Sequence, residues 1–281
     1  MFAEEKFSQR RRHGDGKNCM STYRDVFDKN EKTALIPFFV LGDPDFDTSF
    51  EVIKTAIDAG ADILELGLPF SDPIADGPTI QKADIRALEG GMNCGRGFDL
   101  IHKVKTYRDI PIGLLMYYNL ICHYGVERFF QDAAKAGVNS VLVADLSVDD
   151  APEIVPAMEA AGLDTVFMVT PVTTPARRLR VAEQSTGFVY AVSLLGVTGS
   201  RETLSEAVEG LVAQMKAITE VPICVGFGIS TPRHAASVAA AGADGVIVGS
   251  KLVGLIEANL GDKARMLSDI SAFIGEMKET L

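Results

Sequence analysis

Residues 111–146, PIGLLMYYNLICHYGVERFFQDAAKAGVNSVLVADL, contain the repeating unit from which the fold can be predicted. The apolar runs Pro111–Tyr118 and Ser140–Leu146 have the length and the Val, Ile and Leu content of strands that are buried on both faces. Between them, Val126–Ala136 has the spacing of an amphipathic helix and is followed by Gly137, a residue able to close a helix in the left-handed conformation. The unit therefore predicts two parallel strands joined by a right-handed helical crossover.

The same pattern continues through the rest of the chain. The other apolar runs are Ala34–Val40, Asp62–Gly67, Thr165–Thr170, Phe188–Ser193, Pro222–Gly228 and Gly245–Ser250. Further helical patterns are Phe50–Ala59, Ala151–Ala161 and Leu204–Ile218, with possible capping glycines at Gly60, Gly162 and Gly242. Eight parallel strands, each followed by a helix, predict an α/β fold of the (β/α)₈ TIM-barrel class. The alternative is an open doubly wound sheet, which usually has fewer strands or an antiparallel edge.

The domain organisation follows from length and from the absence of linkers. The chain has 281 residues, and a barrel of this class needs roughly 250. Two domains of about 140 residues would also fit the length, but no stretch rich in Pro, Ser or charge interrupts the repeats. We expect one barrel domain, residues 21–281, whose first helix begins near Met20–Phe27 with Ser21 or Thr22 as its cap and Val26 and Phe27 facing inward.

The N-terminal extension, residues 1–20, is polar and carries Arg10-Arg11-Arg12. Its composition predicts disorder, and it lacks the apolar segment of a secretory signal. Glu4, Glu5 and Asp15 argue against a transit peptide.

Composition excludes several classes of function. The net charge of −11 argues against binding nucleic acid as the main role. The four cysteines are scattered without a C-x-x-C pair, which suits a reducing compartment and offers neither a disulfide framework nor a thiolate metal site. No apolar run approaches the ~20 residues that span a membrane. We therefore expect a cytoplasmic protein that binds neither nucleic acid nor membrane.

Two carboxylates in residues 64–77, LELGLPFSDPIADG, are the candidate catalytic groups. Glu65 lies near the end of an apolar strand and should point into the barrel mouth, where burial raises the pKa of a carboxyl. Asp76 lies on the following loop, where a more solvated carboxylate stays ionised. Two carboxyls in different environments are suited to acid–base chemistry. Two structural roles remain open: an interior acid paired with Lys or Arg for Glu65, and a helix N-cap for Asp76.

The last two strands end in glycines that can bind a phosphate. They carry Gly226-Phe227-Gly228 and Gly249-Ser250, where glycine lets backbone N–H groups approach an anion and a helix N-terminus adds its dipole. Barrels often bind phosphate after strands seven and eight, although glycines that serve only tight turns are the alternative. The segment 194–202 contains two glycines and could form a mobile lid.

The carboxylate segment matches, position by position, the signature of the tryptophan synthase alpha chain family. Matching motifs follow in family order: Phe38 with Leu41-Gly42-Asp43-Pro44, Gly113-Leu114-Leu115-Met116-Tyr117, Val143-Ala144-Asp145, Tyr190, Gly196-Val197-Thr198-Gly199, Gly226-Phe227-Gly228-Ile229-Ser230 and Gly249-Ser250. The chain therefore resembles this family from about residue 21 to residue 275.

The resemblance implies a lyase that splits indole-3-glycerol phosphate into indole and glyceraldehyde 3-phosphate by a retro-aldol step. Glu65 would transfer protons at indole C3 and at the side-chain hydroxyl, and Asp76 would accept the ring N–H. The ring slot would comprise Phe38, Ile80, Leu115, Tyr117, Tyr190 and Phe227, each of which could also be ordinary core. Thr198 would align Asp76, and Gly199, Gly228, Gly249 and Ser250 would hold the phosphate. No lysine ends strands one to seven, and none of the four histidines is spaced to ligate a metal, so neither a Schiff base nor a metal is expected.

The resemblance also implies a partner, a beta subunit in an α₂β₂ complex that receives the indole. Pyridoxal phosphate is expected only in that partner and no cofactor in this chain. The docking face would include Asp72, Pro73, Asn119 and His123. Ser147, where relatives commonly have proline, and His123 depart from the family pattern and bear on partner affinity. Rival functions are an inactive docking subunit, a flavin-dependent barrel and a free-standing lyase.

Overall fold

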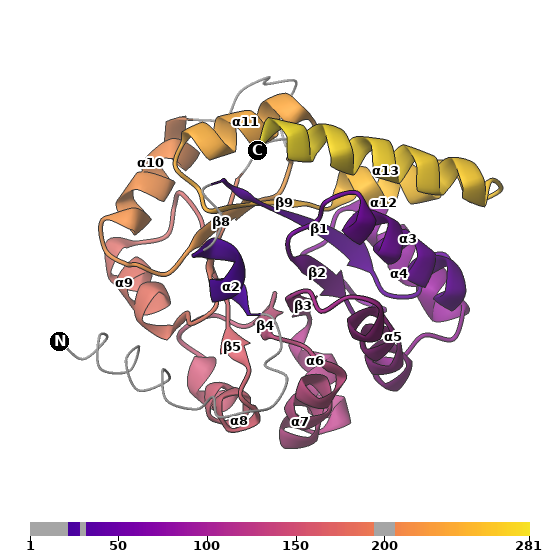
Figure 1. Cartoon of the computed structure of the whole chain (residues 1–281). Coiled ribbons are helices and arrows are strands. Elements are labelled where there is room, and N and C mark those ends of the chain that lie inside the picture. The colour runs from indigo at the N-terminus through magenta and orange to yellow at the C-terminus, as the bar shows by residue number, and fades with distance from the viewer. Residues whose placement is uncertain (1–21, 29–31, 194–205) are drawn as a thin grey trace.

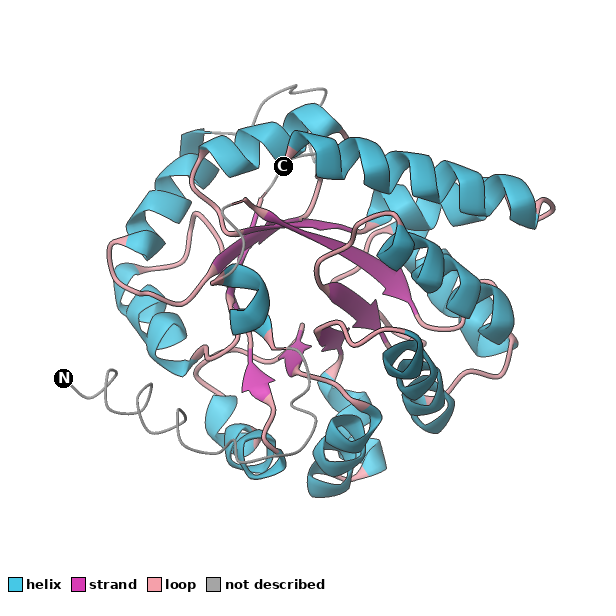
Figure 2. Ribbon diagram, in the orientation of Figure 1, coloured by secondary structure: helices cyan, strands magenta, loops and turns pink. Residues whose placement is uncertain are grey.

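The computed structural model of the chain describes residues 22–28, 32–193 and 206–281. Parallel strands form a ring at the centre, and helices surround it (Figures 1 and 2). The strands are β1 Ala34–Val40, β2 Leu64–Gly67, β3 Ile112–Met116, β4 Ser140–Val143, β5 Asp164–Thr165, β6 Phe167–Val169, β7 Val189–Val192, β8 Ile223–Gly226 and β9 Gly245–Val248. The helices are α2 Tyr23–Phe27, α3 Phe46–Asp58, α4 Pro78–Glu89, α5 Cys94–Tyr107, α6 Tyr118–Tyr124, α7 Val126–Ala136, the 3₁₀ turn η2 Ala151–Glu153, α8 Val155–Ala161, α9 Pro175–Gln184, α10 Glu206–Lys216, α11 Pro232–Ala240, α12 Ser250–Ala258 and α13 Lys263–Thr280.

The strand order β5-β4-β3-β2-β1-β9-β8-β7-β6 confirms the predicted parallel barrel. β1 pairs with both β2 and β9, which joins the two ends of the chain in one sheet. The ends of the strand order, β5 and β6, are separated only by Val166, so the ring is completed through the chain itself. An open sheet with distant edge strands is therefore wrong for this chain.

The fifth predicted strand, Thr165–Thr170, is not continuous. Its first part pairs with β4 and its second part with β7. The break follows Thr165, whose carbonyl accepts the N–H groups of Thr186 and Gly187, and whose own N–H donates to the Thr186 hydroxyl. Because these bonds divert Thr165 to the loop before β7, the ladder with β4 ends there.

Most of the predicted helices are confirmed, with two differences: α3 begins earlier than expected, and one predicted helix is divided in two. Val126–Ala136 is confirmed as α7, and the glycines predicted to close helices have positive φ: Gly60, Gly137, Gly162 and Gly242. α3 begins at Phe46, earlier than expected, because the Asp45 side chain accepts the N–H of Thr48 and caps the helix. The stretch Ala151–Ala161 divides into η2 and α8, and Pro156 near the division has no N–H to continue a helix.

Alternation along the strands separates two apolar cores. Ala34 and Ile36 of β1 belong to the core inside the barrel, whereas Leu35 belongs to the core between barrel and helices. The short helix α2 lies across the N-terminal end of the ring (Figure 1), where the buried Tyr23 hydroxyl lies 2.6 Å from Ser140 Oγ. Barrels of this class have their active sites at the opposite, C-terminal end of the strands.

Candidate active site

Glu65 points into the barrel from β2. Its neighbours Leu64 and Leu66 belong to the core between the barrel and the helices, so the Glu65 side chain between them faces the other way. In the sheet register, Glu65 lies between Phe38 of β1 and Gly113 of β3. The side chain is only 3% exposed. Burial, and secondly the negative charge of Asp76, raise the pKa of Glu65 to about 8. Among the described residues no basic side chain pairs with it, so the structure does not support an interior ion pair.

Asp76 is half-buried on the β2–α4 loop, residues 68–77, and is more exposed than Glu65. The Tyr117 hydroxyl donates to Asp76 Oδ2 at 2.6 Å and accepts the N–H of Ala75 at 3.0 Å. Burial raises the pKa of Asp76, and the Tyr117 hydroxyl opposes that rise. The N-cap of α4 is Gly77, with no side-chain cap, so the helix-cap role considered for Asp76 is wrong.

The predicted ring-slot residues lie around this pair. Phe38 and Tyr190 are buried in the strands, Ile80 is buried on α4, and Leu115 is half-buried on β3. Phe227 is 41% exposed, with a left-handed φ of 67°, and its ring centroid is 5.8 Å from that of Tyr190. These aromatic and aliphatic side chains come from β1, β3, α4, β7 and the residue after β8, and Tyr117 joins them from the N-cap of α6, directly after β3.

Small residues on the strands leave room for those rings. A Cβ on Gly226 would lie 2.1 Å from the Tyr190 hydroxyl, and a Cβ on Gly67 would lie 2.9 Å from Phe38 Cζ. Neither separation is possible without displacing an aromatic ring. Glycine at these positions therefore lets the rings lie across the barrel mouth.

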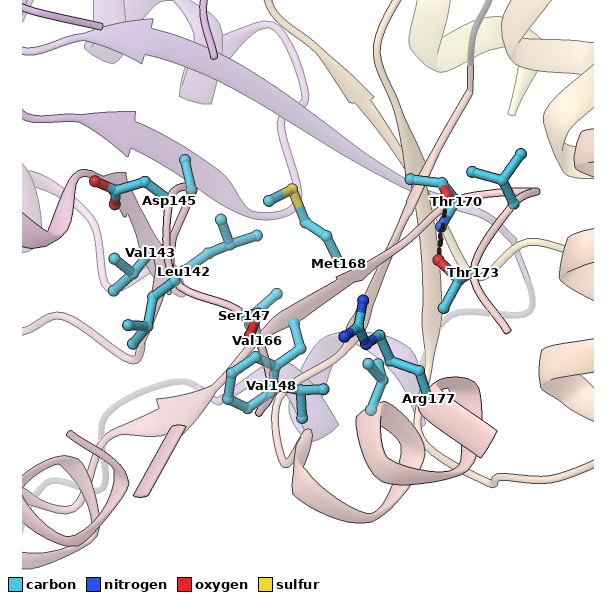
Figure 3. Close-up of a pocket in the computed structure, with 15 residues that line it drawn as sticks. Leu142, Val143, Asp145, Ser147, Val148, Val166, Met168, Thr170, Thr173 and Arg177 are labelled. Carbon is cyan, nitrogen blue, oxygen red and sulfur yellow. Dashed lines mark hydrogen bonds between the residues drawn. The ribbon is translucent and has the colours of Figure 1, made fainter. Parts of the chain in front are cut away.

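A cavity of about 440 Å³ lies between the ends of β4 and β6, with Asp145 on one side and Arg177 on the other (Figure 3). Neither Glu65 nor Asp76 lines it. It does share Leu142, Ala144 and Met168 with the apolar cluster inside the barrel that also contains Tyr190. The cavity is therefore a neighbour of the carboxylate site and not its centre.

The predicted phosphate residues end two adjacent strands. Gly228 follows β8 and has a φ of 76°, next to the left-handed Phe227. Gly249 and Ser250 follow β9, where Gly249 caps α12 without a side-chain hydrogen bond. By contrast, Thr231 caps α11 through the N–H of His234 at 3.2 Å. The N-terminus of α12 is therefore the better placed of the two to receive an anion.

The remaining predicted residues divide into two groups. Thr198 and Gly199 lie outside the described residues. Of the predicted docking residues, Asp72, Asn119 and His123 are exposed, whereas Pro73 is buried. Asp72 follows β2, and Asn119 and His123 lie on α6 directly after β3, so the exposed three surround the C-terminal ends of neighbouring strands.

Sequence reasoning did not single out two residues of this region. The Phe70 ring packs on Tyr117, with centroids 5.2 Å apart. Asp84 is a buried carboxyl on α4. Its signal was present in the sequence, because Ile80, Ala83, Asp84 and Ala87 form one helical stripe in which Asp84 is the only charged residue.

The fold and site together define a (β/α)₈-barrel enzyme with a buried Glu65 near a half-buried Asp76 and with glycines after its last two strands. The model of the family "Tryptophan synthase alpha chain" matches residues 25–281. The alpha chain of Methanothermobacter thermautotrophicus is 47% identical over 94% of this chain and 97% of its own length. That of Methanoregula boonei is 44% identical over 92% and 98%. This chain belongs to the tryptophan synthase alpha chain family.

Solved structures agree with this assignment. The alpha subunit from Legionella pneumophila str. Paris superposes with a TM-score of 0.85 at 32% identity, over 93% of this chain and 98% of that one. Tryptophan synthase of Mycobacterium tuberculosis gives 0.83 at 36% identity, over 93% and 98%. The family's reaction is the lyase step of tryptophan biosynthesis, the cleavage of indole-3-glycerol phosphate, and pyridoxal phosphate belongs to the beta chain. The activity predicted from the sequence is confirmed at this level.

Proposed function

We propose that Glu65 and Asp76 are the catalytic groups of this lyase. The observation that carries the proposal is the burial of Glu65, without a basic partner among the described residues, beside an Asp76 that Tyr117 holds in place. A pKa of about 8 keeps Glu65 mostly neutral at pH 7, so it can protonate indole C3 and, once ionised, accept the proton of the side-chain hydroxyl.

Asp76 would act on the other side of the ring. Protonation at C3 places positive charge on the indole nitrogen, and cleavage of the side chain then regenerates aromaticity. An anionic Asp76 that accepts the ring N–H offsets that charge as it develops. The Tyr117 hydroxyl favours the ionised form of Asp76 because it donates to it.

We further propose that the ring lies among Phe38, Ile80, Leu115, Tyr117, Tyr190 and Phe227, and that the phosphate lies against Gly228, Gly249 and Ser250. The uncapped N-terminus of α12 supports the phosphate position. Thr198 and Gly199 keep the roles predicted for them, an aligning contact to Asp76 and a backbone contact to the phosphate.

We also propose that the chain joins a beta subunit in an α₂β₂ complex, as described for a relative from Pyrococcus furiosus. The docking face would contain Asp72, Pro73, Asn119 and His123. Ile74, which is 84% exposed beside Asp72, supports it with an apolar side chain facing solvent. Pro73, which is buried, would contribute by shaping the loop.

Two further proposals concern the chain as a whole. We place it in the cytoplasm, since Cys94, Cys122 and Cys224 are unpaired. No described helix is long and apolar enough to cross a membrane. Residues 21–281 would form the barrel domain, and the family match from residue 25 supports this division. The extension predicted for residues 1–20 lies outside the described residues.

The test is an indole assay with indole-3-glycerol phosphate, with and without a beta subunit. We expect the isolated chain to release indole slowly and the complex to be faster. No indole release from indole-3-glycerol phosphate, with or without the beta subunit, would indicate an inactive docking subunit that only activates its partner. Yellow colour in the purified protein would instead indicate a flavin enzyme.

A further inference from the structure

Asp145 ends the Val143-Ala144-Asp145 motif, and the roles proposed above do not use it. It follows the end of β4, where the Ala144 N–H donates to the Met116 carbonyl of β3 at 2.8 Å. The ends of β3 and β4 are therefore still joined one residue before Asp145. The Asp145 side chain lies on the rim of the cavity of about 440 Å³, across from Arg177 (Figure 3).

The Asp145 carboxylate binds the beginning of α6. Its Oδ1 accepts the backbone N–H of Tyr118, the first residue of that helix, at 2.8 Å. The N-cap residue of α6, Tyr117, makes no side-chain cap of its own. The first N–H groups of a helix have no partner within the helix, so a carboxylate from the next strand end serves as the cap, and its negative charge suits the helix dipole.

α6 is short enough for such a contact to decide where the helix begins. It has 7 residues, and an isolated helix of fewer than about 12 residues is marginal in water. A second contact of Tyr118 reaches the same part of the chain, because its hydroxyl donates to Glu153 Oε2 at 2.9 Å, in η2. The segment that follows β4 therefore holds the start of α6 through both the backbone and the side chain of Tyr118.

The residue directly before Tyr118 is the one that holds the catalytic loop. Tyr117 is buried, and its hydroxyl donates to Asp76 Oδ2 at 2.6 Å and accepts the N–H of Ala75 at 3.0 Å. Because Tyr117 and Tyr118 are adjacent in the chain, a shift in the start of α6 also moves the Tyr117 ring. A continuous series of contacts therefore runs from Asp145 through Tyr118 and Tyr117 to Asp76.

We propose that Asp145 is a positioning residue: by capping α6 it fixes Tyr117 and, through the Tyr117 hydroxyl, the place of Asp76. In this role Asp145 acts through Tyr117 and needs no contact with the substrate. The proposal rests on the catalytic role given above to Asp76.

Two variants of Asp145 test the cap itself, with indole release by the full-length chain as the assay. Asp145→Ala removes the acceptor for the Tyr118 N–H, whereas Asp145→Asn keeps an acceptor oxygen. We expect Asp145→Ala to lower kcat roughly 10- to 100-fold, with a smaller change in KM, since displacing a catalytic group by about 1 Å has effects of that order. Asp145→Asn should retain most of kcat.

A double variant tests whether Asp145 acts through the Tyr117 hydroxyl. Tyr117→Phe already lacks the hydrogen bond to Asp76. Adding Asp145→Ala to it should therefore lower kcat by no more than about 2-fold further, whereas residues that act independently give losses that multiply.

Asp262→Ala is the matched control. The Asp262 carboxylate caps α13 by accepting the N–H of Arg265 at 3.0 Å, a bond of the same kind, and none of the proposed site residues lies on α13. Loss of either cap should lower Tm by roughly 2–4 °C. Only Asp145→Ala should also lower kcat.

Four results would overturn the role of Asp145. They are a wild-type kcat in Asp145→Ala, an equal loss of kcat in the Asn and Ala variants, losses that multiply in the double variant, and an equal loss of kcat in Asp262→Ala. Normal turnover in Asp76→Asn would instead refute the catalytic role of Asp76, on which the proposal rests.

Discussion

Glu65 is an unusual core residue, because it is a carboxyl buried in the barrel without a basic partner among the described residues. A core acid with only a structural role would be paired, since an unpaired buried carboxyl is costly. The cost is tolerated here by keeping the group neutral at pH 7, which is also the form that a proton donor requires.

Glu65→Gln should abolish most of the alpha reaction while leaving the fold intact. The amide keeps the shape of the side chain but transfers no proton, and general acid–base groups contribute about 10²–10⁴-fold. Indole release from indole-3-glycerol phosphate measures the rate, and circular dichroism monitors the fold. A variant that retains most of its rate would show that another group transfers the proton.

The same substitution should stabilise the protein at high pH. The folded-state pKa of Glu65 is raised to about 8, so the wild type loses stability as pH rises from about 4.5 to about 8, and the Gln variant does not. A shift of that size corresponds to roughly 5 kcal/mol. Thermal unfolding at pH 5 and pH 8.5 should show the variant gaining on the wild type; an equal difference in Tm at both values would contradict this pKa.

Asp76→Asn should lower kcat on the order of 10²-fold, with substrate binding less affected, because the developing charge on the ring loses its anionic partner. The amide oxygen can still accept from Tyr117, so the loop should keep its position. Tyr117→Phe is the comparison: it keeps the Asp76 carboxylate but loses the two hydrogen bonds of the Tyr117 hydroxyl, to Asp76 and from Ala75. Normal turnover with weakened binding in Asp76→Asn would contradict the role.

At the scale of elements, the sequence predicted strands better than loops. The run Ala34–Val40 was predicted to the residue, because burial on both faces gives a signal that does not depend on distant residues. The other predicted runs coincide with strands but extend beyond the strand ends into the adjoining turns. The break between β5 and β6 could not be foreseen, since it depends on Thr165 bonding to residues 186 and 187, which are distant in sequence. The role of Tyr117 had the same limit, because its contact with Asp76 joins residues 41 positions apart.

The glycine-containing turns after β8 and β9 lead to a prediction for phosphate binding. Gly249→Ala would place a Cβ 3.2 Å from Phe38 Cδ1 and beside the N-terminus of α12. Any other residue in place of Gly228 would have to adopt a backbone φ of 76°. We expect KM for indole-3-glycerol phosphate to rise roughly 10- to 100-fold, the effect of losing one or two hydrogen bonds to an anion. The reverse reaction, from indole and glyceraldehyde 3-phosphate, should be impaired equally.

Gly254→Ala is the control within the same helix, because a Cβ there meets nothing within 4 Å. It should leave KM unchanged and slightly favour the helix. An unchanged KM in both the Gly249 and Gly228 variants would move the phosphate site away from these strands.

At the scale of the whole molecule, α2 closes the N-terminal end of the barrel, and the two carboxyls lie toward the opposite end of the strands. Thr22 caps α2 in a reciprocal bond with Asp25, as the sequence predicted for Ser21 or Thr22. The main anchor is Tyr23, whose ring lies 5.5 Å from Phe188 and whose hydroxyl meets Ser140. Val26 and Phe27, expected to face inward, are only partly buried. The helical spacing of Val26 and Phe27 could be seen in the sequence. The buried position of Tyr23 could not be predicted, because it exists only once the barrel has closed.

Deleting residues 1–19 should therefore leave Tm and indole production essentially unchanged. The segment has few apolar residues with which to offset the entropy of ordering, and within the described residues Tyr23 already closes this end of the barrel. Tyr23→Ala in the full-length chain is the positive control and should destabilise by about 3–5 kcal/mol, as expected for removing a buried ring. Thermal unfolding and indole assays, with and without the beta subunit, measure both variants. A loss of several degrees, or of activation by the beta subunit, in the truncated chain would show that residues 1–19 pack on the barrel or on its partner.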